Sequence, residues 1–205
     1  MAEKIYLMMN KPKGYVCSAV SDSHKTVYEL LSPELQTMVQ GAKRGERLHT
    51  IGRLDADTTG LLLFTTDGKF SHRIASNEAL EGPCNMPGIT KTYLATLKTP
   101  VLQEQQSQYI THASKGLILP PEKKFGEQKS APSKLEFLNE TTCRITVCEG
   151  KFHEVRRIFK ALGNEVTELK RIAIGGLELP EALLQGTYKP LQPEDIQKLF
   201  SDFDR

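Results

Sequence analysis

The sequence predicts an α+β fold built around a largely antiparallel sheet. Three observations support this: the apolar runs are mostly short or alternate with polar residues, helical stretches come singly between strand pairs, and turn residues separate neighbouring strands. The 205 residues suffice for one compact domain, or two closely packed halves, with a real core. No repeat or flexible linker divides the chain, so we expect one folded region over residues 1–205.

The N-terminal part is dominated by a buried strand at 61–66, the longest apolar run, which ends at the turn residues Asp67 and Gly68. A shorter strand is expected at 5–9, followed by a turn at Asn10–Gly14 because Pro12 and Gly14 interrupt regular structure. Apolar spacing further predicts helical segments at 25–31, from Pro33, and around 70–75.

The C-terminal part alternates strands and single helices. Residues 77–90 and 115–133 lack periodicity and are expected to be irregular. The pattern predicts a strand at 91–97, a helix at 101–110, a hairpin of 134–138 with 142–148, an amphipathic helix within 151–163, a strand–turn–strand unit at 165–179 and a last helix from Pro193.

The composition is ordinary for a globular protein, with 39% apolar and 25% charged residues and a net charge of +2. No run reaches the roughly 18 apolar residues of a membrane span, and the N-terminus has no signal-peptide pattern, so we expect a cytoplasmic protein away from membranes. Four cysteines form no CxxC pair and no zinc spacing, which predicts reduced thiols. Neither a P-loop nor a dinucleotide fingerprint is present.

Two carboxylates stand out in the loop that precedes the strand at 61–66. Asp55 and Asp57 lie in the sequence GRLDADTTGLLLFTTDG, which covers residues 52–68. Taken alone, they are typical of turn residues. They could also bind a divalent cation, or one of them could act by itself as nucleophile or base. A polar loop joined to a rigid strand is a suitable place for a reactive group.

Two further stretches carry side chains suited to a site. Tyr93 is either a core residue of its strand or a stacking platform for an unpaired base. Arg156 lies near the start of the helix within 151–163, where the helix dipole disfavours a cation unless a carboxylate is close. The alternative without a functional role is that this helix presents a solvated basic face, formed by His153, Arg156, Arg157 and Lys160.

Together these stretches resemble the pseudouridine synthases, in the branch that holds the bacterial enzymes of the small ribosomal subunit and their large-subunit relatives. The resemblance spans nearly the whole chain and keeps the motif order. It rests on Asn10–Gly14, Gly52–Gly68, Lys91–Tyr93, Glu149–Arg157, Leu162–Val166, Ile174–Leu177 and Gly186–Pro190.

The resemblance implies a mixed, mainly antiparallel sheet in two halves with a central catalytic cleft. It implies that Asp55 is the catalytic aspartate, Arg156 its ion-pair partner and Tyr93 the residue that stacks on the target uracil. Ile174 and Leu177 would form apolar walls of the base pocket. RNA contacts are expected from Arg53, Lys91, His153, Arg157 and Lys160, and from the basic loop with Lys43, Arg44 and Arg47.

The implied reaction isomerises a specific uridine after the base flips out of its RNA. The motifs most resemble those of the small-subunit enzymes, which implies 16S ribosomal RNA as the substrate. It needs no cofactor and no metal. The alternatives are a large-subunit (23S) enzyme or a non-catalytic RNA-binding module of the same fold. We expect a monomer that acts on ribosomal RNA or a ribosomal precursor particle.

Three departures from the family pattern are visible. The small-subunit enzymes carry an N-terminal S4-like RNA-binding domain, and here the catalytic part begins at the N-terminus, so we expect that domain to be absent. The loop from Ser76 to Lys91 is longer than usual and is expected to contact RNA or to move. Glu154 stands where a glutamine is usual, and its charge would raise the pKa of Asp55 unless Arg156 and Arg157 offset it.

Overall fold

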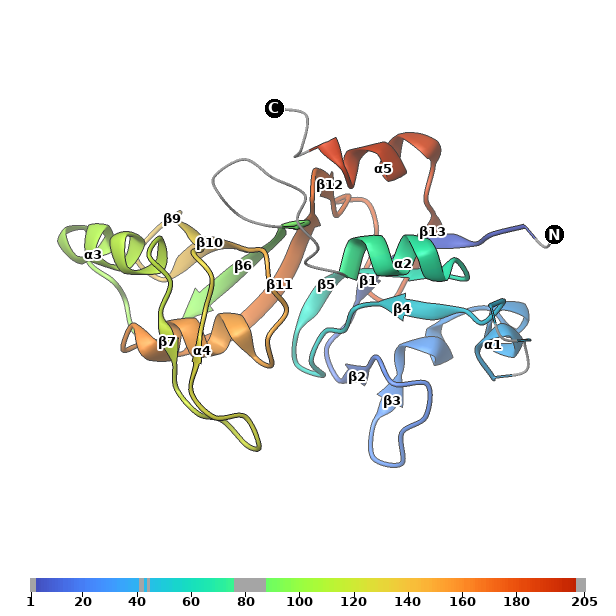
Figure 1. Ribbon diagram of the computed structural model, residues 1–205, viewed down its shortest axis with the longest axis horizontal. Helices are drawn as coiled ribbons and strands as arrows, with labels where there is room; N and C mark the ends of the chain where they lie inside the picture. Colours follow the sequence, from blue (N-terminus) through green and yellow to red (C-terminus); the bar gives the residue numbers. More distant parts are fainter. Residues whose placement is uncertain (1–2, 41–42, 44, 76–87, 202–205) are drawn as a thin grey trace.

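The computed structural model describes residues 3–40, 43, 45–75 and 88–201. In this part of the chain, a nine-stranded sheet forms the centre of the fold, with strand order β13-β1-β5-β11-β6-β10-β9 and with β4 and β12 on its sides. All pairs are antiparallel except β5 with β11. The predicted α+β class with a mixed, mainly antiparallel sheet is therefore confirmed, and Figure 1 shows the two halves of the sheet side by side.

The N-terminal half of the sheet is organised around β1 and β5 (Thr59–Thr65), whose side chains from Leu61 to Phe64 are fully buried. The predicted turn at Asn10–Gly14 begins later than expected, because Asn10 and Lys11 still pair with β5. Two strands of three residues each were not predicted, because a segment this short cannot show a periodic pattern. The half consists of β1 (Tyr6–Lys11), β4 (His49–Ile51), β5 and β13 (Tyr188–Pro190).

The C-terminal half follows the predicted strands closely. The strand at 91–97 is observed with those bounds, and the hairpin at 134–148 is present. Alternation of apolar and polar residues is strong in these strands because one face packs on a core, which is why the pattern located them. The strands are β6 (Lys91–Leu97), β9 (Lys134–Phe137), β10 (Thr142–Val147), β11 (Val166–Ile174) and β12 (Leu177–Glu178).

The two halves join where β5 and β11 run parallel for a short distance, with Lys170 opposite Thr59 and Arg171 opposite Gly60. Arg171 is buried, and its Nε donates a hydrogen bond of 2.8 Å to the carbonyl oxygen of Leu61. The loop 52–58 enters β5 at this seam. A rigid junction between two half-sheets therefore fixes the position of Asp55.

Helices cover the sheet singly, as the sequence predicted. In Figure 1, α2 and α5 lie over the N-terminal half, and α3 and α4 lie over the C-terminal half. Among the described residues, no helix combines the length and apolar character needed to cross a bilayer. The helices are η1 (Val27–Leu30, a 3₁₀ helix), α1 (Pro33–Gln40), α2 (Gly68–Ala75), α3 (Gln103–Ala113), α4 (Glu154–Ala161) and α5 (Pro193–Lys198).

Short strands complete the connections. β2 (Tyr15–Val16) pairs with β3 (Lys25–Thr26), and β7 (Ile118–Leu119) pairs with β8 (Gln128–Lys129) to form the base of a long hairpin. This β7–β8 hairpin falls in a stretch expected to be irregular. Cys17, Cys143 and Cys148 are buried free thiols, in agreement with the prediction of reduced cysteines. Cys84 and residues 76–87 of the loop expected to contact RNA lie outside the described residues.

Candidate active site

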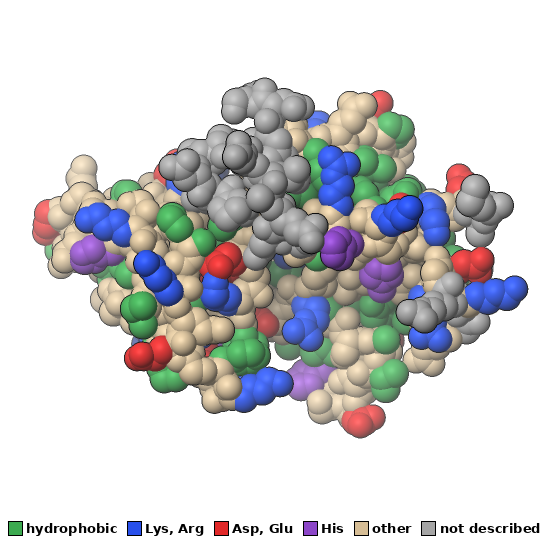
Figure 2. Space-filling model, viewed as in Figure 1, with side chains coloured by type: hydrophobic (Ala, Val, Ile, Leu, Met, Phe, Trp, Pro, Cys, Tyr) green, Lys and Arg blue, Asp and Glu red, His purple; other side chains and the backbone are tan. Residues whose placement is uncertain are grey.

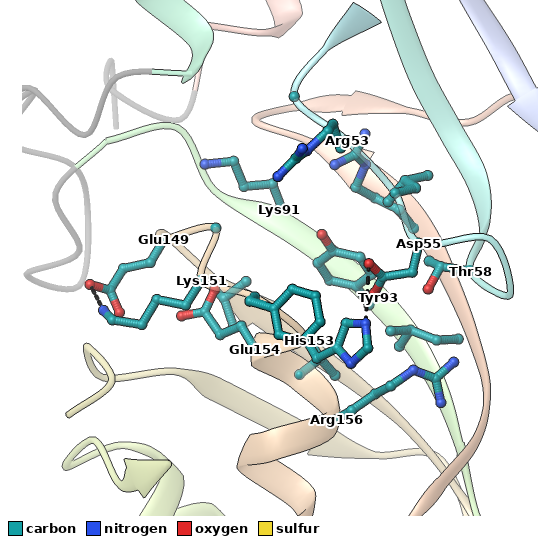
Figure 3. Close-up of a pocket in the computed structure, with 18 of the residues that line it drawn as sticks. Arg53, Asp55, Thr58, Lys91, Tyr93, Glu149, Lys151, His153, Glu154 and Arg156 are labelled. Carbon is teal, nitrogen blue, oxygen red and sulfur yellow. Dashed lines mark ion pairs between the residues drawn. The ribbon is translucent and has the colours of Figure 1, made fainter. Parts of the chain in front are cut away.

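A cavity of about 620 Å³ opens between the two halves of the sheet, and its lining residues come from both. The loop 52–58 forms one side, while β6, the start of α4 and the β7–β8 hairpin form the others (Figure 3). On the face shown in Figure 2, lysines and arginines are scattered rather than gathered in one patch.

The loop 52–58 is held from behind by Lys11, which is fully buried. Its Nζ donates hydrogen bonds to the carbonyl oxygens of Thr58 (2.8 Å), Asp55 (3.0 Å) and Ala56 (3.3 Å). Burial lowers the pKa of Lys11. The nearby Cys17, Asp55 and Asp57 act in the opposite direction, because they favour the charged ammonium form. The sequence motif at Asn10–Gly14 thus fixes the backbone on which Asp55 sits. Sequence reasoning treated Lys11 only as part of a turn.

Asp55 points into the cavity, with its side chain 38% exposed. The imidazole of His153 lies beside it, with Nε2 at 3.5 Å from Asp55 Oδ1. Thr58 lies beside it, and Thr58 Oγ1 is buried without a hydrogen-bond partner among the described atoms. A carboxylate that is accessible, fixed by its backbone and next to an unpaired hydroxyl is a suitable reactive group.

Arg156 does not pair with Asp55, contrary to the expectation. Its Nη2 lies 2.8 Å from Asp57 Oδ2, and its Nη1 donates to the carbonyl oxygen of Val166. The side chain leaves α4 on the side of Asp57, and in Figure 3 its guanidinium points away from Asp55. Arg156 Nε is buried and has no hydrogen-bond partner among the described residues.

Tyr93 lies in the cavity beside Asp55 (Figure 3). It is on β6, between β10 and β11, with Ile145 and Arg171 as its strand neighbours. The half-buried ring packs against apolar clusters of both halves. Its place agrees with the expected stacking role, which stays a prediction.

Arg53 and Lys91 also line the cavity, as expected for RNA contacts. Arg53 is exposed, whereas Lys91 is largely enclosed and its Nζ donates 3.3 Å to the carbonyl oxygen of Cys148. Burial lowers the pKa of Lys91, and the nearby Arg171 guanidinium lowers it further. The Lys91 ammonium group and the Arg53 guanidinium group lie on the same side of the cavity in Figure 3.

Arg157 cannot reach RNA in this structure, so that expectation is wrong. The side chain is fully buried on the face of α4 that packs on the β7–β8 hairpin. It donates hydrogen bonds to the carbonyl oxygens of Pro120 and Gly126, each at 2.8 Å, and to Gln128 Oε1 at 2.7 Å. The guanidinium satisfies hairpin carbonyls, which explains why a charge is buried there.

The two residues expected to form the walls of the base pocket do not line the cavity, so that expectation is also wrong. Ile174 and Leu177 are both 2% exposed and belong to a core cluster of the N-terminal half, away from the cavity lining. The apolar side chains that do line the cavity include Leu54, Phe125, Val147, Phe152, Val155 and Leu169. The remaining cations expected at RNA, Lys43, Arg47 and Lys160, do not line it, and Arg44 lies outside the described residues.

A carboxyl pair that the sequence did not predict lies across the cavity from Asp55. Glu154 is buried and faces Glu149, which forms an ion pair with Lys151. Burial, and secondly the charge of Glu149, raise the pKa of Glu154 to about 7. The concern that Glu154 places a charge beside Asp55 is therefore reduced, because Glu154 turns toward Glu149 and holds its proton near neutral pH. No cluster of three or more His, Cys, Asp or Glu residues in the described part of the chain could hold a metal ion.

Known proteins resemble the chain over nearly its full length. A sequence model described as RNA pseudouridylate synthase matches residues 5–161. Ribosomal small subunit pseudouridine synthase A of Haemophilus influenzae is 40% identical over 194 residues, which cover 95% of this chain and 73% of the relative. The protein of the same name from Escherichia coli strain K12 is 41% identical over 191 residues, covering 93% of this chain and 72% of the relative.

Solved structures agree with the sequence matches. A crystal structure described as pseudouridylate synthase superposes with a TM-score of 0.79 and 39% identity, over 97% of this chain and 75% of that one. A Cbf5-Nop10-Gar1 complex gives a TM-score of 0.55 at 17% identity, covering 88% of this chain and 52% of that one, which bears on the fold alone.

Proposed function

The chain belongs to the RNA pseudouridylate synthase family, and on that premise we propose that it isomerises one uridine of small-subunit ribosomal RNA with Asp55 as the reactive group. The relatives that are about 40% identical carry the name ribosomal small subunit pseudouridine synthase A, which favours the 16S over the 23S RNA as substrate. The match spans more than nine tenths of this chain and nearly three quarters of those relatives' length.

The observation that carries the proposal is the placement of Asp55. It is an accessible carboxylate on a loop whose backbone is fixed by the buried Lys11, at the bottom of a cavity of nucleotide size. Uridine becomes pseudouridine when the N1–C1′ bond breaks, the base turns and C5 bonds to C1′, while a proton leaves C5 and another joins N1. One ionised carboxylate can begin this isomerisation by attacking the sugar or the base, or by removing a ribose proton.

The other cavity residues fit the needs of a flipped base. Unstacking a nucleotide costs a few kcal/mol, and stacking on Tyr93 together with phosphate contacts would offset that cost. Arg53, Lys91 and Arg156 provide cations among the residues that line the cavity. Leu54 and Leu169 provide apolar contact beneath the base.

We extend the proposal to the organisation of the chain. Residues 1–205 would form one catalytic region with two subdomains, which correspond to the two half-sheets on either side of the cavity. A monomer would suffice, because residues of a single chain supply the cavity. A ribosomal substrate would support a cytoplasmic location.

The test compares the purified chain with the variant Asp55→Asn on 16S and 23S ribosomal RNA, with pseudouridine mapped by chemical sequencing. We expect one new pseudouridine in 16S RNA with the natural chain and none with the variant, whose RNA affinity and melting temperature should stay close to natural values. Asp67→Asn is the control, because Asp67 lies at the N-terminus of α2, outside the cavity. An active Asp55→Asn variant would refute the mechanism, and a product in 23S RNA would reassign the substrate.

A further inference from the structure

His153 makes contact with a carboxylate on each side. Its Nε2 lies 3.5 Å from Asp55 Oδ1, and its Nδ1 lies 2.8 Å from Glu122 Oε1. The side chain is only 19% exposed, and its ring stacks on Phe152 with 3.8 Å between centroids. Phe152 in turn stacks on Phe125 of the β7–β8 hairpin. The imidazole is thus fixed in plane and in position.

The backbone of His153 is unusual as well. The residue has φ 49° and ψ 32°, the left-handed conformation, directly before α4. A side chain other than glycine adopts this conformation at an energetic cost, and such residues are concentrated at functional sites. The conformation turns the imidazole into the cavity, whereas α4 itself begins at Glu154.

The two ring nitrogens serve two different contacts. Each imidazole nitrogen can take part in one hydrogen bond. Glu122 engages Nδ1 at 2.8 Å, which fixes the orientation of the ring, and Nε2 is left facing Asp55 Oδ1.

We propose that His153, oriented by Glu122, is a positioning residue that holds the Asp55 carboxylate for reaction. This inference rests on the proposed function. The charged groups around His153 are Asp55 from the loop 52–58, Glu122 from the β7–β8 hairpin, and Lys151, Glu154 and Arg156 from the start of α4, with Lys123 over the Phe152 ring. The hairpin thereby takes part in the site through Glu122, although it lies far from Asp55 in sequence.

The experiment is a double-mutant cycle with Glu122→Gln and His153→Gln. Single-turnover rates on 16S RNA are measured at saturating enzyme, together with RNA dissociation constants and melting temperatures. We expect each single variant to lose about 10- to 100-fold in rate, since a small displacement of a reacting group has effects of this size. The double variant should lose no more than the worse single one. RNA affinity should change by less than about twofold in all of them.

Two controls match the changes in charge and side chain. Glu127→Gln removes an exposed carboxylate from the same hairpin, and His112→Gln removes an exposed imidazole from α3. Both should retain the natural rate.

Other outcomes overturn the inference. Multiplying losses in the double variant would mean that Glu122 and His153 act separately. Weakened RNA binding with an unchanged saturated rate would make His153 a plain RNA contact. Natural rates in both single variants refute the inference even if the proposed function is correct, and a natural chain without pseudouridine formation refutes the proposed function alone.

Discussion

Gly60 and Arg171 lie so close that a Cβ atom on Gly60 would overlap the carbonyl oxygen of Arg171. The two residues face each other where β5 and β11 run parallel, at the junction of the half-sheets. Gly60 also has φ +100°, a conformation that L side chains rarely adopt. The loop that carries Asp55 ends one residue before this junction, so the distance between the two halves and the position of the reactive group depend on one glycine.

Gly60→Ala should therefore destabilise the fold and reduce activity. Overpacking and the positive φ together should lower the free energy of unfolding by about 3 kcal/mol, measured by urea denaturation. Gly68→Ala is the matched control, since a Cβ there meets no atom within 4 Å and the residue begins α2. A Gly60→Ala variant as stable as the natural chain would show that the two strands can separate without loss.

Tyr93 offers a test of stacking against hydroxyl chemistry. If the ring stacks on the flipped uracil, Tyr93→Phe should keep most of the activity. Tyr93→Ala should lose a contribution of about 1–3 kcal/mol in single-turnover rate or RNA binding. Melting temperatures separate this loss from damage to the apolar clusters that the ring also contacts. Equal losses in both variants would instead assign the role to the hydroxyl group.

The sequence predicted those parts of the site that follow from local pattern. The loop before an apolar strand identified Asp55, and alternation placed Tyr93 on a strand. It could not choose the partner of Arg156, because Asp55 and Asp57 are two residues apart and both are within reach of a helix start. The structure decides this through the direction in which Arg156 leaves α4.

Contacts across the fold were beyond prediction. Glu122 lies in a stretch without periodicity, and only the pairing of β7 with β8 brings it to His153. Arg157 has the same residue type as Arg156, yet a shift of one position on α4 turns it from the cavity to the hairpin. The same limit applies to Ile174, because an apolar strand residue can face either a pocket or a core.

Arg156 and Asp57 form an ion pair that should contribute little by itself, because the Asp57 side chain is 54% exposed. Asp57→Asn should therefore change the rate by less than about threefold. Arg156→Gln should reduce RNA affinity at least about tenfold, because it removes a cation from the lining of the cavity. RNA binding at two salt concentrations measures this, and Arg53→Gln is the comparison within the cavity. Equal effects of the Asp57 and Arg156 variants would mean that Arg156 acts only through Asp57.

Glu154 should make stability depend on pH. Its pKa is raised from 4.5 to about 7, mainly by burial and then by Glu149. Below pH 4.5 the group is protonated in the folded and unfolded chain, so the stability from its raised pKa is fully present. As the pH rises through about 7, the unfolded chain has already lost this proton, and the folded chain must ionise a buried carboxyl beside Glu149. About 2 kcal/mol of stability should be lost over that range.

Glu154→Gln removes this penalty while keeping the size of the side chain. At pH 8 the variant should be more stable than the natural chain by about 2 kcal/mol, whereas at pH 4.5 the two should be close. Urea denaturation at both pH values measures the difference. The exposed Glu168→Gln is the control, because a solvated carboxylate gives a small difference at either pH. A Glu154→Gln difference that does not change with pH would show that Glu154 is ionised throughout and that its charge is balanced by Lys151 instead.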